Sequence, residues 1–210
     1  ACRYETVTDE VMKAMADTQT PQGILALCRQ FSYELSDILG ERKEGDEHTQ
    51  EKAPAQLVIL ETLQDPGNLG TILRAGEGAG ITGVIMSSTT ADIYNPKVIR
   101  STMGSVYRVP FVYVEDLGAV RRVKQAGVRL YAAHLKGEKN YDQQDYTGST
   151  GFLIGNEANG LSDETAELAD AYIKIPMLGK VESLNAAVAA SILMYETARQ
   201  RRNGKGQKID

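Results

Sequence analysis

The sequence is poor in the residues and runs that mark several common protein classes. Its two cysteines, Cys2 and Cys28, are too few for a disulfide framework and lack metal-ligand spacing. No apolar run approaches the ~20 residues that cross a bilayer, and residues 1–5 lack the apolar segment of a signal peptide. We therefore expect a cytoplasmic protein with no membrane partner. The missing initial methionine indicates a cut or incomplete chain.

Familiar catalytic signatures are scarce as well. The two histidines are far apart, His48 in a charged stretch and His134 at the end of an expected strand, where a structural role is more common. No P-loop, nucleophile elbow or usefully spaced carboxylate pair occurs, and no metal site is predicted. Gly76, Gly78 and Gly80 spell G-x-G-x-G, but they fall at a helix end, where C-capping explains them. The sequence thus argues against a dinucleotide-dependent dehydrogenase.

The net charge of −5 weighs against a nucleic-acid partner only if it is evenly spread. Residues 1–56 carry 11 acidic and 6 basic side chains, whereas residues 57–210 carry 17 of each. Phosphate contacts need local cations, not a basic total. Two basic clusters occur in the second part: Arg121, Arg122, Lys124 and Arg129, and then Arg199, Arg201, Arg202, Lys205 and Lys208. Each is interpreted either as a solvated helix face or tail, or as a phosphate-binding surface.

Residues 1–33 contain too little apolar sequence to fold alone. We expect a helix over 9–18 capped by Thr8, a turn at Pro21-Gln22-Gly23 and a buried strand over 24–28. This part is interpreted as the end of a larger N-terminal domain. Residues 34–56 are rich in charge, with almost nothing apolar near their end, and are predicted to be a linker.

From Leu57 onward, apolar runs alternate with helical patterns. Strands are expected over 57–60, 83–86, 109–114, 128–133, 152–154 and 171–175, and helices after 65–68 and over 96–103, 115–126, 163–168 and 184–202. Such alternation predicts an α/β domain over 57–210, with a mostly parallel sheet and helices on both faces. Ligands of such sheets bind at the carboxyl ends of the strands.

Three segments follow strand ends and are unusually polar. In 65–74, Asn68 can cap a helix, Gly70 permits close packing, and Arg74 is expected to be half-buried. An arginine there either extends from a core helix into solvent or binds phosphate, since its fork matches phosphate oxygens. In 153–161, Gly155 directly follows a strand and exposes backbone groups to a flat ligand, with Asn156 and Glu157 as polar neighbours.

The third segment runs from Ile175 to Ala189. Ser183 is expected to cap the last helix, and the small residues 185–191 allow close packing or a subunit interface. Each segment alone has a purely structural explanation as a turn, a cap or a packed helix.

Together, however, the segments resemble the three ordered motifs of the SpoU/TrmH family of RNA methyltransferases, in the SPOUT class. The pattern N-x-G-x-x-x-R is Asn68, Gly70 and Arg74. The apolar-apolar-G-x-E-x-x-G-L pattern runs from Leu153 to Leu161, and I-P-M with E-S-L-N-x-A-x-A runs from Ile175 to Ala189. The resemblance covers residues 57–202, and residues 7–28 resemble the end of the family's N-terminal RNA-binding domain.

The resemblance implies a C-terminal trefoil knot and a homodimer formed through the knot and the last helix. It also implies that S-adenosyl-L-methionine is the methyl donor for a ribose 2′-hydroxyl in RNA. The cofactor-binding set would be Leu153, Ile154, Gly155, Asn156, Ile175, Met177, Leu184 and Ala187. The catalytic set would be Arg74, Asn68, Glu157, Ser183 and Asn185.

The resemblance places Arg74 beside the reacting ribose. An arginine with a pKa above ~12 is a poor base, so we expect it to bind phosphate and stabilise negative charge on the ribose oxygen. The stretch at residues 20–23, Thr-Pro-Gln-Gly, resembles members that act on large-subunit (23S) ribosomal RNA, which favours rRNA over tRNA. The alternatives are a tRNA ribose or base methyltransferase of the same fold, and a non-catalytic RNA-binding ribosome-assembly factor.

Overall fold

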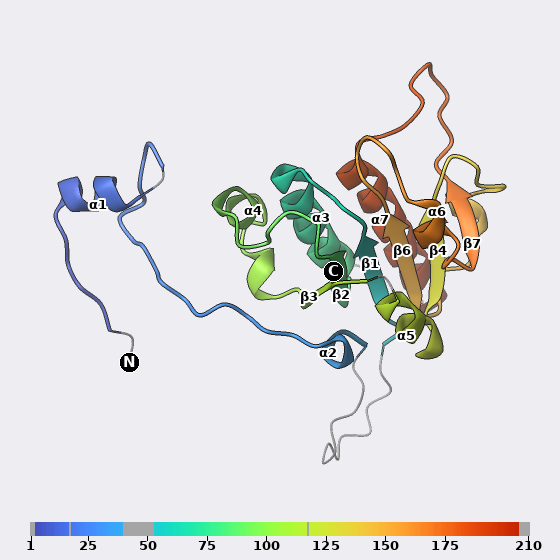
Figure 1. Ribbon diagram of the computed structural model, residues 1–210, viewed down its shortest axis with the longest axis horizontal. Coiled ribbons are helices and arrows are strands. Elements are labelled where there is room, and N and C mark those ends of the chain that lie inside the picture. Colours follow the sequence, from blue (N-terminus) through green and yellow to red (C-terminus); the bar gives the residue numbers. More distant parts are fainter. Residues whose placement is uncertain (1–2, 17, 40–52, 117, 206–210) are drawn as a thin grey trace, which may run out of the picture. The chain divides into compact units, whose positions relative to one another are not determined.

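The computed structural model describes residues 3–16, 18–39, 53–116 and 118–205 (Figure 1). Most of the predicted linker over 34–56 lies outside these residues, as does His48. The chain separates into two compact units, residues 1–32 and 33–210. A short helix, α2 (Leu35–Leu39), buries Leu35 and Ile38 in the core of the second unit, although it lies within the predicted linker.

The first unit contains one helix, α1 (Asp9–Met15), among its described residues. The Thr8 side chain accepts a hydrogen bond from the Val11 amide, which confirms the predicted cap, but the helix ends three residues earlier than expected. The predicted buried strand over 24–28 is wrong. The segment forms no ladder, and Ile24 and Leu27 are 87% and 99% exposed, because no strand within the described part of this unit pairs with them.

The second unit is built on a seven-stranded sheet with the order β3-β2-β1-β6-β4-β7-β5. The strands are β1 (Gln56–Leu60), β2 (Gly83–Ser87), β3 (Phe111–Val114), β4 (Arg129–Ala133), β5 (Lys139–Asn140), β6 (Thr150–Ile154) and β7 (Ala171–Lys174). Every paired strand is parallel to its neighbour. The predicted parallel α/β sheet is therefore confirmed, with β5 as an added edge strand.

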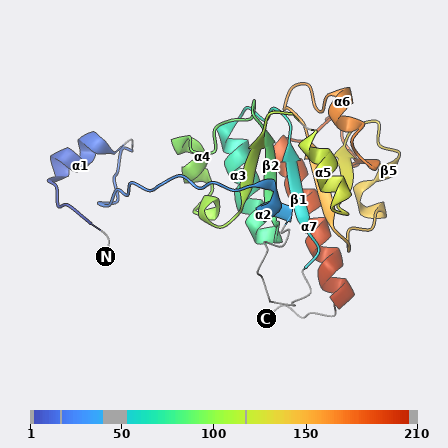
Figure 2. The same ribbon diagram turned by 60° about the horizontal axis from the view of Figure 1, so that its bottom comes forward.

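Helices cover both faces of the sheet, and the side chains of each strand alternate between the two cores. Val58 and Leu60 face the core shared with α3 (Pro66–Ala79), α4 (Pro96–Ser101) and α7 (Ala186–Lys205). Leu57 and Ile59 face the core shared with α2, α5 (Ala119–Gln125) and α6 (Asp163–Ala166). Figure 2 shows α2 and α5 in front of the strands and α7 behind them. The central strands are buried on both sides, which is why they read as continuous apolar runs.

Two helices begin at residues other than those predicted. α3 is capped by Asp65, whose carboxylate accepts from the Asn68 amide at 2.8 Å, because Pro66 suits the first helical position. Asn68 therefore lies in the first turn with its side chain free for other partners. Asn185, not Ser183, caps α7, since its Oδ1 accepts from the Ala187 amide at 2.9 Å.

Several cations of the two basic clusters have partners within the chain. The guanidinium of Arg201 donates to four backbone carbonyls, those of Pro54, Ala55, Tyr146 and Gly148, at 2.8–3.2 Å. It thereby fastens the last helix to the chain that enters β1 and to the turn that enters β6. Arg199 pairs with Glu196 on its own helix, and Lys124 pairs with Asp170.

We expect Arg201→Ala to lower the free energy of unfolding by about 2–4 kcal/mol, because hydrogen bonds from a charged group to four backbone carbonyls are lost. Urea unfolding followed by circular dichroism measures this change. The neighbouring Arg202→Ala, which removes an exposed side chain, is the matched control. Equal stability of the two variants would contradict the stabilising role of the Arg201 hydrogen bonds.

Candidate functional site

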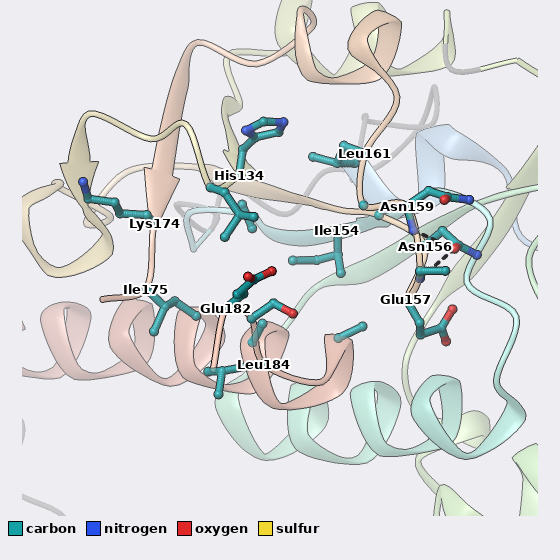
Figure 3. Close-up of a pocket in the computed structure, with 18 of the residues that line it drawn as sticks. His134, Ile154, Asn156, Glu157, Asn159, Leu161, Lys174, Ile175, Glu182 and Leu184 are labelled. Atoms are coloured by element: carbon teal, nitrogen blue, oxygen red, sulfur yellow. Dashed lines mark hydrogen bonds between the residues drawn. The ribbon is translucent and has the colours of Figure 1, made fainter. Parts of the chain in front are cut away.

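A pocket of about 290 Å³ opens where β4, β6 and β7 end (Figure 3). Its apolar wall includes Ile154, Leu161, Ile175 and Leu184, and Glu182 projects toward its centre. The volume is near the lower end of the ~300–1,000 Å³ usual for small-molecule sites. Its place at the carboxyl ends of parallel strands is where the sheet topology predicts a ligand.

Most of the predicted cofactor-binding residues meet in this pocket. Its lining contains Ile154, Gly155, Asn156, Ile175, Met177 and Leu184, and also Glu157 and Ser183 from the predicted catalytic set. Leu153 and Ala187 are not part of the lining. Leu153 alternates to the opposite face of the sheet and is buried in the core beneath α5, while Ala187 is buried between α7 and the sheet. On α7, Ala186 and Ala189 face the pocket instead.

The floor of the pocket depends on a residue without a side chain at position 155. A Cβ on Gly155 would lie 2.1 Å from the carbonyl carbon of Gly160 and 2.2 Å from the amide nitrogen of Leu161. The chain turns back here through a bridge in which Asn156 and Gly160 exchange backbone hydrogen bonds. Gly160 supports the turn with a φ of 70°. The second motif is therefore a tight loop whose backbone is exposed to the pocket.

A line of hydrogen bonds joins the three polar segments. Glu157 Oε1 accepts from the Asn68 side chain at 3.0 Å and from the Asp65 amide at 3.1 Å, and its Oε2 accepts from the Gln64 amide at 3.2 Å. Asn68 Oδ1 in turn accepts from the Asn185 side chain at 2.9 Å. Residues from the start of α3, the end of β6 and the start of α7 thus converge beside the pocket.

These donors set the charge state of Glu157. Partial burial raises the pKa of Glu157, but hydrogen bonds from the Asn68 side chain and from the backbone amides of Glu157, Asp65 and Gln64 together outweigh burial and hold the pKa below its usual value of 4.5. The carboxylate is ionised at neutral pH and accepts from three N–H donors. Its geometry suits holding Asn68 in place more than removing a proton from a substrate.

Arg74 differs from the expectation. It is exposed, not half-buried, and lies outside the pocket lining. Positions 70, 74 and 77 share one face of α3, and this face meets α4, where Ser101 fills the space above Gly70, and the short helix η1 (Ser105–Tyr107), where Ser105 bonds Glu77. Arg74 forms no hydrogen bond or ion pair with any residue that the structure describes. Its guanidinium is available to a ligand.

Sequence reasoning missed several residues of the pocket wall, among them His134, Lys174 and Glu182. His134 is stacked on Tyr172 with ring centroids 5.4 Å apart, and its Nδ1 accepts from the Lys136 amide at 3.0 Å. The sequence feature that could have identified His134 is its position directly after β4, at the same edge of the sheet as the three motifs. Across the described ranges, no group of three or more His, Cys, Asp or Glu residues has the geometry to hold a metal ion. In the same ranges, no helix is both long and apolar enough to cross a bilayer.

A parallel α/β domain with a ligand pocket at its carboxyl edge and three convergent motifs defines a class of cofactor-binding enzymes. Within that class, the model of the SpoU rRNA Methylase family matches residues 55–195, and the chain belongs to this family. It is 31% identical to the 23S rRNA (guanosine(2553)-2′-O)-methyltransferase RlmP of Bacillus subtilis strain 168, over 90% of this chain and 70% of that protein. It is 38% identical to a 23S rRNA (uridine(2479)-2′-O)-methyltransferase of Streptomyces viridochromogenes, over 70% of this chain but 54% of that relative.

Solved structures agree with the sequence relatives. The SpoU methyltransferase AviRb from Streptomyces viridochromogenes, in complex with the cofactor AdoMet, superposes with a TM-score of 0.79 at 30% identity, covering 93% of this chain and 72% of that one. An AdoMet-bound rRNA methyltransferase from Sinorhizobium meliloti gives 0.75 at 33% identity, with 91% and 70% covered. The family that the sequence motifs resemble is therefore confirmed.

The depressed pKa of Glu157 makes its stabilising effect depend on pH. Relative to Glu157→Gln, which cannot accept three N–H donors equally well, the wild type should be more stable at neutral pH. The advantage should be fully present above the usual value of 4.5 and shrink as the pH falls through the lower pKa of the folded state. Urea unfolding at stepped pH measures this.

Glu138→Gln, at an exposed position, is the control for the loss of a carboxylate. A stability gap for Glu157→Gln that stays constant to well below pH 4.5 would refute the assigned hydrogen bonding.

Proposed function

We propose that this protein methylates a ribose 2′-hydroxyl of ribosomal RNA, with S-adenosyl-L-methionine as the methyl donor. The observation that supports this proposal most strongly is the pair of hydrogen bonds that join Glu157 to Asn68 and Asn68 to Asn185. These bonds bring all three family motifs together beside one pocket. Support for the chemistry comes from the relatives, which are named 23S rRNA 2′-O-methyltransferases, and from AdoMet-bound structural neighbours.

The pocket suits this cofactor. Ile154, Ile175 and Leu184 offer apolar surface to a flat ring, and the loop after Gly155 exposes backbone donors and acceptors to a ring edge. Glu182 supplies a negative charge toward the pocket centre, which suits a cationic ligand. When bound, the cofactor provides an activated methyl group on a positively charged sulfur. These residues would hold it, and the absence of a side chain at Gly155 lets the loop fold back closely enough to form this wall.

The protein's own residues would align and stabilise the reacting ribose. The Asn68 and Asn185 amides, fixed against each other and by Glu157, have the rigidity needed to orient a hydroxyl toward the pocket, and alignment of this kind lowers a barrier by several kcal/mol. Arg74, with no protein partner among the described residues, would bind the adjacent phosphate and stabilise negative charge on the ribose oxygen. Ser183 lines the pocket and would contact the cofactor or the ribose.

Ribosomal RNA is favoured over transfer RNA by the names of the first relatives. A tRNA enzyme has some support too, since a TrmH/SpoU tRNA modifying enzyme of A. aeolicus superposes with a TM-score of 0.65 at 29% identity. Mapping of 2′-O-methyl marks on both RNAs, after incubation with the protein and cofactor, decides between them. Cofactor binding without transfer to any RNA would support the alternative of an RNA-binding assembly factor.

Gly155→Ala should weaken cofactor binding about tenfold or more, because its Cβ would collide with the Gly160 backbone and displace the loop. Calorimetry with S-adenosyl-L-methionine measures the loss. Gly179→Ala is the matched control, since a Cβ there meets nothing within 4 Å. Wild-type affinity in Gly155→Ala would place the cofactor elsewhere.

Arg74→Ala should reduce methyl transfer to RNA about 100-fold or more while leaving cofactor affinity unchanged, because it removes charge stabilisation outside the pocket wall. Transfer of a labelled methyl group at saturating cofactor measures the rate, and Arg74→Lys should restore part of it. Full turnover by Arg74→Ala would eliminate the assigned role.

We extend the proposal to a homodimer formed through α7 and the segment that precedes it. In support, Leu178 and Val181 are 100% and 62% exposed, and Val188 and Tyr195 on α7 are 47% and 49% exposed. Apolar side chains gathered in this way mark an association surface. Because Arg74 lies outside the pocket wall of its own protomer, an active site shared between subunits is part of this proposal. The proposal also includes a trefoil knot in the second unit and an RNA-binding role for residues 1–33. It places the action of the protein on ribosomal RNA in the cytoplasm.

Val188→Glu should convert the dimer to a monomer, because a carboxylate cannot be desolvated in an apolar interface. Light scattering coupled to size-exclusion chromatography gives the molar mass. Met15→Glu, at an exposed apolar position of the first unit, is the control. A wild-type protein of monomer mass at high concentration would overturn the interface.

A further inference from the structure

The pocket wall is described above mainly by its apolar side chains, but its charged side chains differ in what they contact. Among the described residues that line it, the titratable ones are His134, Glu157, Lys174 and Glu182. Glu157 accepts from three N–H donors, and His134 Nδ1 accepts from the Lys136 amide. Figure 3 shows the side chain of Lys174 extending away from the middle of the pocket. Three of these four side chains are therefore engaged or directed elsewhere.

Glu182 is the fourth, and its carboxylate extends between Ile154 and Ile175 toward the middle of the pocket (Figure 3). It lies in the segment that precedes α7 and is exposed to solvent. Among the residues that the structure describes, none forms a hydrogen bond or an ion pair with it. A ligand that fills the pocket displaces water from this carboxylate, and desolvation of an unpaired charge beside apolar side chains is unfavourable. Such a ligand must bring a compensating group.

The proposed cofactor carries two positive groups, a sulfonium in the middle of the molecule and an ammonium at its amino-acid end. The ammonium adjoins the cofactor's own carboxylate and donates hydrogen bonds to water. The sulfonium has no N–H or O–H, so a nearby negative charge is what stabilises it inside a protein. Because Glu182 reaches the middle of the pocket, it is placed for the middle of a ligand that fills the pocket.

We propose that Glu182 makes the pocket selective for the charged methyl donor over its uncharged product. Methyl transfer breaks the sulfur–methyl bond and leaves its electron pair on sulfur, so the sulfonium becomes a neutral thioether. The ribose oxygen bonds the methyl group and releases its proton to solvent. Glu182 then faces a ligand without a compensating charge, which favours release of the product and entry of the next donor. This inference rests on the proposed function and adds to it a residue that determines ligand selectivity.

The test is calorimetry on the whole protein with S-adenosyl-L-methionine and with its thioether product, S-adenosyl-L-homocysteine. Neither titration requires RNA or turnover. The wild type should bind the donor about tenfold more tightly than the product. Glu182→Gln keeps the shape of the side chain and removes its charge. It should weaken donor binding about tenfold while product binding stays the same or becomes tighter.

Glu164→Gln is the matched control, because it removes the same charge from an exposed position on α6, outside the pocket lining. It should bind both ligands like the wild type. Glu182→Asp, which retains the charge, should keep a preference for the donor. Added salt should weaken donor binding to the wild type more than product binding, since the two ligands share their amino-acid end and differ in the charge on sulfur.

Equal weakening of donor and product binding in Glu182→Gln would overturn the inference, because it would assign the carboxylate to a group that both ligands share, such as the ammonium. Unchanged affinity for both ligands would overturn it as well. If either result came from a protein that methylates RNA, the proposed function would stand.

A selective loss of donor binding in Glu182→Gln, found in a protein that methylates no RNA, would support the inference and refute the proposed activity. A wild-type protein that binds neither ligand would overturn both.

Discussion

The arrangement of the site depends on a single side-chain amide. Asn68 donates to Glu157 and accepts from Asn185, so the start of α3, the loop after β6 and the cap of α7 are tied at one point. This is possible only because Asp65, rather than Asn68, caps the helix, which leaves the side-chain amide of Asn68 available for these two partners. A carboxylate or aliphatic residue at 68 would satisfy one neighbour at most, since only an amide both donates and accepts in fixed directions.

α3 takes part in two different surfaces. Its first turn contacts the pocket wall through the hydrogen bond from Asn68 to Glu157, whereas the face carrying Gly70, Arg74 and Glu77 is directed toward α4 and η1. Under the proposed function, α3 would position both the residues beside the cofactor and Arg74, which would bind the substrate backbone. Helix-mounted residues keep their relative positions better than loop residues do, which suits a reaction that requires alignment of two large ligands.

The fold could be predicted because its signals are local. Central strands such as 57–60 and 83–87 are buried on both faces and read as apolar runs, and helices alternate with them. The N-cap of α3 was predicted at Asn68 but lies at Asp65. Both residues are good N-caps, and only the position of Pro66, which suits the first helical residue, decides between them. The strand expected over 24–28 failed because an apolar run does not reveal whether a partner strand exists.

The candidate site was predictable in its segments but not in its side chains. Neighbouring residues of a strand point to opposite faces of the sheet. Ile154 therefore lines the pocket, while Leu153 is buried on the other face. The hydrogen bonds of Glu157 join residues 89–93 positions apart, and no spacing in the sequence encodes them. His134 and Glu182 were missed for the same reason, because they reach the pocket through the topology of β4 and the approach to α7.

The clamp made by Arg201 has a consequence for the order in which the molecule is completed. β1 lies between β2 and β6 in the sheet, and the Ala55 amide, just before β1, donates to the Ser149 side chain 94 residues later. Arg201 then fastens both entrances from the last helix. During synthesis, the early strands β1, β2 and β3 must therefore wait beside an open edge until β6 and α7 leave the ribosome. A nascent chain of this protein therefore exposes one unpaired edge of the apolar strand β1 until residues 150–154 of β6 have been made, and in that interval it needs a chaperone.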